Sequence, residues 1–145
     1  MRKVLIAGVA AAALTTAAHG AVSPYQAKNR DVSVTVAYTG KGAVDDKHQI
    51  LVFLFDHPAP TAASEPLGVR STPKSGGTVT FSDVAANPVY VILVYDEKSN
   101  YDGKSGPPPA GTPISTYSKG GKPVPVTPGP AAKVKTSFDD SQRWK

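Results

Sequence analysis

The sequence contains no cysteine, one methionine and one tryptophan in its 145 residues. The absence of cysteine excludes disulfide bonds, so packing alone must stabilise the fold. With no cysteine, and with Met1 as the only methionine, a structural zinc site or a copper site lacks its usual sulfur ligands. Histidine is also scarce, because only His48 and His57 lie outside the N-terminal segment.

Residues 1–20 have the pattern of a cleaved signal peptide. The basic residues Arg2 and Lys3 precede the apolar run of residues 4–18, and small residues occupy the −3 and −1 positions of a cleavage site before Ala21. The alternative is a membrane anchor, but the run is shorter than the roughly 20 residues that a spanning helix needs. We therefore expect export to the periplasm or the outside of a Gram-negative bacterial cell.

The remaining chain, residues 21–145, has the size of a single domain. Residues 21–30 are expected to be a flexible lead-in, and residues 96–130 form a loop region rich in proline and glycine. The formal net charge is +5, of which Arg2 and Lys3 supply two charges. The lysines are scattered and are not interleaved with stacking aromatics, so nucleic-acid binding is not expected. No later segment is long enough to span a membrane.

The central stretch, residues 77–95, is expected to form strand, turn and strand. Its first part alternates polar and apolar residues, as a half-buried strand does, whereas residues 89–95 are apolar or aromatic throughout. Residues 49–55 form a second all-apolar run, and residues 31–38 alternate cleanly. Runs that are apolar at every position are typical of strands buried on both faces. Residues 49–55 and 89–95 are therefore expected to pair at the centre of two packed sheets.

Four further segments have the length and composition of shorter strands: residues 67–72, 112–117, 122–126 and 131–138. No segment has the period of a long amphipathic helix. About seven short strands predict an all-β fold, an antiparallel β-sandwich of immunoglobulin-like or transthyretin-like architecture.

The segment around residues 79–117 resembles the hairpin of transthyretin-like and carboxypeptidase-regulatory-like β-sandwiches. Val84 and Tyr90 fit its turn pattern, with Asn87-Pro88 where Pro-Gly is usual. It looks closest to an uncharacterised family of small exported bacterial sandwiches, whose loop and aromatic-Ser motifs match Asp96, Asn100, Asp102, Gly103, Gly106-Pro107 and Tyr117-Ser118. The resemblance implies a fold and export rather than a reaction.

The acidic loop that follows residues 89–95 is a candidate calcium site. Asp96, Asn100 and Asp102 offer the hard oxygen ligands that Ca²⁺ prefers. However, Lys98 stands where a calcium loop needs an acid, and no bidentate glutamate follows. The alternative is a polar turn whose side chains bind the local backbone. No other cofactor is expected.

Asp56 and His57 are a candidate acid/base pair. Adjacent residues on a strand point to opposite faces, so a polar pair at the end of a strand is the better interpretation. Serines are numerous, but no Gly-x-Ser-x-Gly elbow is present. The expectation is therefore that the protein is not an enzyme.

Tyr101, Tyr117 and Trp144 lie outside the core strands and are the most plausible binding residues, although they also suit packing over the edge of the sandwich. The sequence favours an exported, non-catalytic binding or interaction module of the cell envelope, with an envelope protein or a glycan as partner. Two alternatives stay open, namely a carbohydrate-binding module that uses these aromatics and a small hydrolase or metal-dependent enzyme that uses Asp56, His57 and the loop acids.

Overall fold

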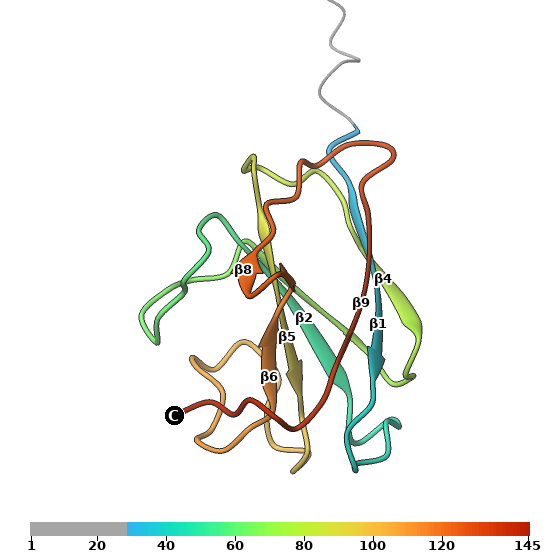
Figure 1. Ribbon diagram of the computed structural model, residues 1–145, viewed down its shortest axis with the longest axis vertical. Helices are drawn as coiled ribbons and strands as arrows, with labels where there is room; N and C mark the ends of the chain where they lie inside the picture. Colours follow the sequence, from blue (N-terminus) through green and yellow to red (C-terminus); the bar gives the residue numbers. More distant parts are fainter. Residues whose placement is uncertain (1–28) are drawn as a thin grey trace, which may run out of the picture.

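The chain forms two β-sheets packed face to face, as the computed structural model in Figure 1 shows for residues 29–145. The predicted signal peptide and most of the predicted lead-in lie outside these described residues. Sheet A has the strand order β4 (Gly77–Phe81), β1 (Val32–Tyr38), β9 (Lys133–Phe138). Sheet B has the order β3 (Gly68–Thr72), β2 (Ile50–Phe55), β5 (Tyr90–Tyr95), β6 (Ile114–Thr116). The predicted β-sandwich is confirmed.

A two-stranded hairpin, β7 (Ser118–Lys119) and β8 (Lys122–Pro123), interrupts the loop region between β6 and β9. Beyond it, Val126 forms a bridge with Val89, just before β5. In the part of the chain that the structure describes, no helix is long and apolar enough to cross a membrane.

The main core lies between the two sheets. In β1 every second residue is buried, so Val32, Val34 and Val36 face sheet B while the residues between them face outward. The inner face of sheet B supplies Leu54 and Leu93, both fully buried. This alternation is what a period-2 strand pattern predicts for a sheet with one wet face.

Sheet B differs from sheet A because its central strands are buried on both faces. All six residues of β2 and five of the six in β5 are buried. The outward-facing residues of β2 and β5 form a second apolar cluster together with Tyr101 from the loop after β5. Its members are Leu51, Phe53, Phe55, Ile92, Val94 and Tyr101. The pairing of β2 with β5 is confirmed, and the outer face of sheet B is covered by loops rather than by another sheet.

Two features of the topology depart from the expectation. First, β1 pairs with β9 in parallel, with Val34 opposite Val134, so sheet A is mixed rather than purely antiparallel. Second, β4 and β5 do not form a hairpin, because β4 pairs with β1 in sheet A and β5 pairs with β2 in sheet B. The segment between them crosses from one sheet to the other, a connection that local sequence does not distinguish from a turn.

Gly103 fixes one of the covering loops onto the outer face of sheet B. Its φ is +74°, and a Cβ at this position would lie 2.8 Å from Val69 Cγ1, 2.9 Å from Leu51 Cδ2 and 3.0 Å from Phe53 Cζ. Both the backbone conformation and the close approach therefore require glycine.

We expect Gly103→Ala to destabilise the domain by about 2 kcal/mol or more, because it adds a steric clash to a strained backbone. Gly121→Ala is the matched control, since Gly121 has a φ of +75° and open space where its Cβ would lie. Denaturant unfolding of the two variants separates the clash from the backbone strain. Equal destabilisation of both would show that the loop does not pack as closely as described.

Candidate functional site

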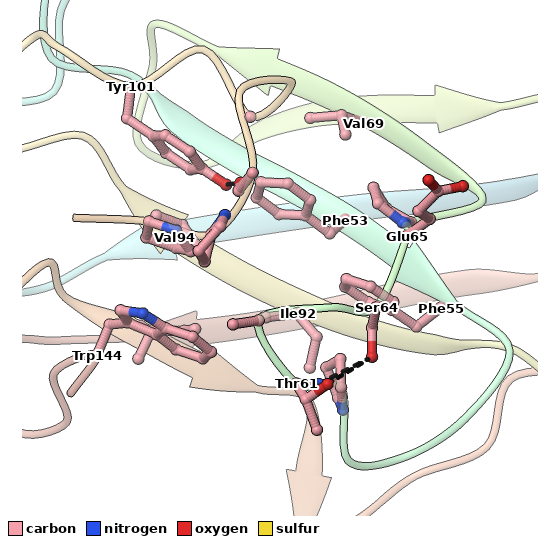
Figure 2. Close-up of a pocket in the computed structure, with 18 of the residues that line it drawn as sticks. Phe53, Phe55, Thr61, Ser64, Glu65, Val69, Ile92, Val94, Tyr101 and Trp144 are labelled. Carbon is pink, nitrogen blue, oxygen red and sulfur yellow. Dashed lines mark hydrogen bonds between the residues drawn. The ribbon is translucent and has the colours of Figure 1, made fainter. Parts of the chain in front are cut away.

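An open cleft of about 530 Å³ lies on the outer face of sheet B (Figure 2). This volume falls within the roughly 300–1,000 Å³ range of small-molecule sites. Outward side chains of β2 and β5 form its floor, namely Phe53, Phe55, Ile92 and Val94. Residues 60–66 form one wall, residues 103–108 form another, and Ile114 and Trp144 close the side near β6. We refer to this site as the cleft.

Three aromatic rings form a row along the floor of the cleft. The ring centroids of Phe55 and Phe53 are 6.4 Å apart, and those of Phe53 and Tyr101 are 6.2 Å apart. The planes differ by only 18° and 22°, so the three rings are nearly parallel. Such a row presents a long apolar surface on which a flat or extended apolar group can pack.

The C-terminal tail positions Trp144 at the side of the cleft. The backbone N–H of Trp144 donates to the Thr112 carbonyl at 2.9 Å, and the backbone N–H of Gly111 donates to the Trp144 carbonyl at 2.8 Å. Arg143 strengthens this attachment, because its guanidinium donates to Glu97 at 2.8 Å and to the Gly111 carbonyl at 2.6 Å. The single tryptophan is therefore a natural fluorescent reporter of the cleft.

The structure brings together two of the three aromatics selected from the sequence. Tyr101 and Trp144 both line the cleft, whereas Tyr117 packs against the main core between the sheets. Tyr101 is only 9% exposed, so its ring belongs to the floor rather than to a projecting platform. The sequence predicts only a core position for the floor residues Phe53 and Ile92. The signal for a covered outer face of sheet B is that both strands, β2 and β5, are apolar or aromatic at every position.

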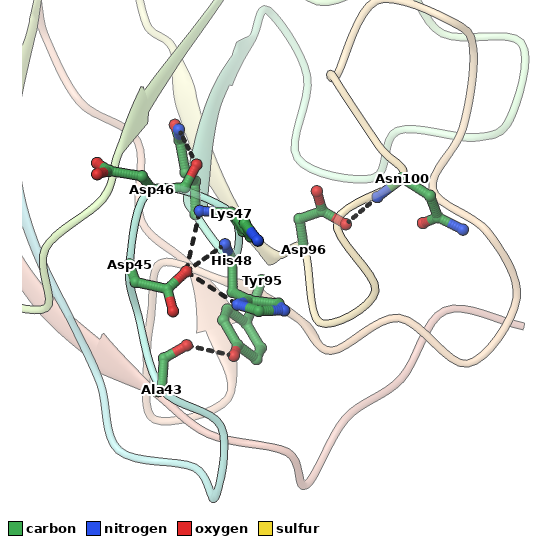
Figure 3. Close-up of polar contacts among 9 residues, drawn as sticks. Ala43, Asp45, Asp46, Lys47, His48, Tyr95, Asp96 and Asn100 are labelled. Atoms are coloured by element: carbon green, nitrogen blue, oxygen red, sulfur yellow. Dashed lines mark hydrogen bonds and ion pairs between the residues drawn. The ribbon is translucent and has the colours of Figure 1, made fainter.

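The acidic loop has the contacts of a polar turn. The Asp96 carboxylate accepts hydrogen bonds from the backbone N–H groups of Asn100 at 3.1 Å (Figure 3) and Tyr101 at 3.3 Å. Asp102 accepts from the N–H groups of Lys104 at 2.8 Å and Ser105 at 3.2 Å, and from the Ser105 hydroxyl. These bonds lower the pKa of the Asp102 carboxyl, with the Lys104 N–H as the main cause.

Within residues 29–145, no three His, Cys, Asp or Glu side chains gather in a way that suits a metal ion. The candidate calcium ligands Asp96 and Asp102 both direct their oxygens at their own loop. Asn100 is exposed, and its contact with Asp96 is made by its backbone.

A second polar turn precedes β2 and is drawn in Figure 3. One Asp45 oxygen accepts from the backbone N–H of His48 at 2.8 Å and of Lys47 at 2.9 Å, and lies 2.9 Å from His48 Nδ1. These contacts, with the His48 N–H as the largest, lower the pKa of Asp45. Below this turn the Tyr95 hydroxyl donates to the Ala43 carbonyl at 2.6 Å. His48 is therefore occupied in a turn and does not line the cleft.

Asp56 and His57 do contact each other, which corrects the expectation that they point apart. They follow the last residue of β2 and lie in a bend, where strand alternation no longer applies. His57 Nδ1 lies 2.6 Å from Asp56 Oδ1, and its Nε2 lies 3.1 Å from Ser64 Oγ. The hydrogen bond to His57 lowers the pKa of Asp56. Ser64 lines the cleft, so an Asp–His–Ser chain of hydrogen bonds ends at its wall.

Tyr101 joins the floor to the wall formed by residues 103–108. Its hydroxyl donates to the Gly106 carbonyl at 2.8 Å. Burial, and secondarily the nearby Asp102 carboxylate, raise the pKa of Tyr101 to about 12 from an ordinary value of 10.0. The neutral phenol is therefore favoured in the folded protein.

The stability that Tyr101 contributes is expected to be constant below pH 10 and to fall as the pH rises from 10 towards 12. In this interval the unfolded chain releases the phenol proton while the folded chain retains it, so the folded state binds more protons. Tyr101→Phe removes the hydrogen bond and is expected to lower the free energy of unfolding by about 1 kcal/mol at neutral pH. At alkaline pH its free energy of unfolding should fall less steeply than that of the unmodified protein. Urea unfolding of both proteins across this pH range checks the difference. Lysines and Tyr95 titrate in both proteins, so the two curves should differ only by the contribution of Tyr101. Parallel declines would contradict the assignment.

Comparison of the chain with protein-family models, curated proteins and solved structures gives no match, so the family resemblance drawn from residues 79–117 stays a prediction.

Proposed function

We propose that this protein is an exported, non-catalytic binding module of the cell envelope and that its ligand site is the cleft. The observation that carries the proposal is the partial cover of sheet B. An apolar face that loops only partly close leaves aromatic and aliphatic side chains around an open cleft of about 530 Å³. Apolar clefts with a few polar groups at the rim are the usual form of ligand sites.

Part of the cleft is built from the proline- and glycine-rich loop region of residues 96–130. Tyr101, residues 103–108 and Ile114 come from this region and line the cleft. The Tyr101–Gly106 hydrogen bond and the packing of Gly103 attach that wall to the floor of the cleft. A wall that is already ordered loses little conformational freedom on binding, which favours affinity.

The proposal predicts that a neutral apolar molecule such as decanol changes the fluorescence of Trp144 in a saturable manner. Ile114→Asp is expected to weaken this binding by about tenfold or more, because it places a charge in the apolar wall. Thr80→Asp, on the exposed face of sheet A, is the matched control and should bind as the unmodified protein does. If the fluorescence does not change at saturating decanol, or if the two variants bind equally well, the cleft is not the ligand site.

Hydrolysis is a second candidate function, and the Asp56–His57–Ser64 chain of hydrogen bonds is the observation that favours it. Its order matches that of a serine hydrolase triad. Two features favour binding instead. The Asp56 and His57 side chains are 62% and 41% exposed, whereas a triad acid is normally buried. Ser64 Oγ also accepts the Thr61 N–H at 2.9 Å, which is the contact of a serine that stabilises a turn.

We therefore expect Ser64→Ala to leave the hydrolysis of a p-nitrophenyl ester unchanged relative to the wild-type protein. Any slow reaction due to the exposed imidazole should be lost only in His57→Ala. The measurement is the release of p-nitrophenolate under conditions of excess ester. A rate that depends on both Ser64 and His57 would identify a hydrolase and overturn the non-catalytic proposal.

A further inference from the structure

A second hollow adjoins the cleft at its Tyr101 end. Its lining includes Lys47, Val69, Asp96, Tyr101, Asp102 and Lys104. Three of these residues, Val69, Tyr101 and Lys104, also line the cleft. The cleft and the hollow therefore share a boundary at Tyr101 and Val69, where Gly103 packs closely on the sheet, and Lys104 lines both.

The acidic side chains around the hollow are already hydrogen-bonded within the protein, whereas its lysines belong to no ion pair among the described residues. The Asp96 and Asp102 carboxylates already accept hydrogen bonds from N–H groups of their own loop. The ion pairs found in residues 29–145 are Asp45–His48, Asp56–His57 and Glu97–Arg143, so neither Lys47 nor Lys104 belongs to one. Two lysine ammonium groups thus remain available to a ligand at this end.

Arg70 adds positive charge nearby, but its guanidinium is directed at the Phe81 ring of sheet A. Its guanidinium donates to the Val69 carbonyl at 2.9 Å and lies 5.5 Å from the centre of the Phe81 ring. It therefore contributes to the local field, while direct contact with a ligand is left to Lys47 and Lys104.

The opposite end of the cleft carries the other sign of charge. In Figure 2, Ser64, Glu65 and Phe55 lie on one side of the cleft, and Tyr101 and Trp144 lie on the other. Asp56 follows Phe55 directly and is exposed. An elongated ligand in the cleft consequently meets Glu65 at the Phe55 end and Lys104 at the Tyr101 end. The Asp96 and Asp102 carboxylates of the adjoining hollow are already bonded to N–H groups of their own loop.

From this arrangement we propose that the ligand is a small amphiphilic carboxylate. Its apolar chain lies in the cleft along Phe55 and Phe53 towards Tyr101, and its carboxylate lies beside Lys104, at the boundary with the hollow that Lys47 also lines. The charge distribution fixes the direction of the ligand, because the reverse orientation would place a carboxylate beside Glu65. Electrostatic complementarity of this kind acts on orientation and selectivity more than on total affinity. The inference rests on the proposed function of the cleft.

The test compares three compounds with the same ten-carbon chain, namely decanoate, decanol and decyltrimethylammonium, below the concentrations at which they form micelles. Binding is followed by the fluorescence of Trp144. We expect the affinity order decanoate, decanol, decyltrimethylammonium, with the preference for decanoate declining as salt is added. Lys104→Glu should weaken decanoate binding by about tenfold relative to decanol binding, since it replaces an attraction by a repulsion of similar size. Lys119→Glu, an exposed lysine of β7 outside both linings, is the control.

The outcomes separate the inference from the function on which it rests. Equal binding of decanoate and decanol, unaffected by Lys104→Glu, would overturn the carboxylate assignment and leave the cleft as an apolar site. Failure of all three compounds to bind would remove both proposals. Sedimentation of the protein with anionic phospholipid vesicles in a Lys104-dependent manner, without binding of free decanoate, would instead identify the lysines as a contact to a membrane surface.

Discussion

The structure depends on the double-sided burial of β2 and β5. Their inward side chains pack against sheet A, as in any sandwich, but their outward side chains are equally apolar and cannot be left in water. Burying an apolar side chain of this size is worth about 1.5–3 kcal/mol. The chain therefore has to supply a cover for the outer face of sheet B, and the long loops of this otherwise small domain have that role.

The cover is made by segments that stabilise themselves. Asp96 binds the N–H groups of its own loop, Tyr101 closes the same loop through the Gly106 carbonyl, and Gly103 allows the backbone to approach the sheet. The tail from the C-terminus is attached separately, through Arg143 and Trp144. Independent attachments hold the walls apart, which is why an apolar face that is mostly covered still contains an open cleft.

Much of the fold follows from periodicity. The alternation in β1 and the unbroken apolar runs of β2 and β5 predict a sandwich with two central strands, and the structure has both. The sequence does not reveal that the segment between β4 and β5 crosses from sheet A to sheet B, because such a crossing and a tight turn use the same residue types. It also does not show that Asp56 and His57 meet, since their contact depends on a bend that begins where the strand ends. The expectations of a calcium site, a glycan ligand and a protein partner depend on which residues the fold brings together from distant parts of the sequence. Local sequence patterns do not contain this information.

The parallel pairing of β1 with β9 has a consequence for how the molecule folds. The central strand of sheet A, β1, has β9 as one of its two neighbours, with Val34 opposite Val134. Sheet A is therefore complete only when two segments that are far apart in sequence have come together. Pairings between distant parts of a chain slow folding, because the long intervening loop has to be closed first. We therefore expect the β1–β9 pairing to be the slow step in completing the sandwich.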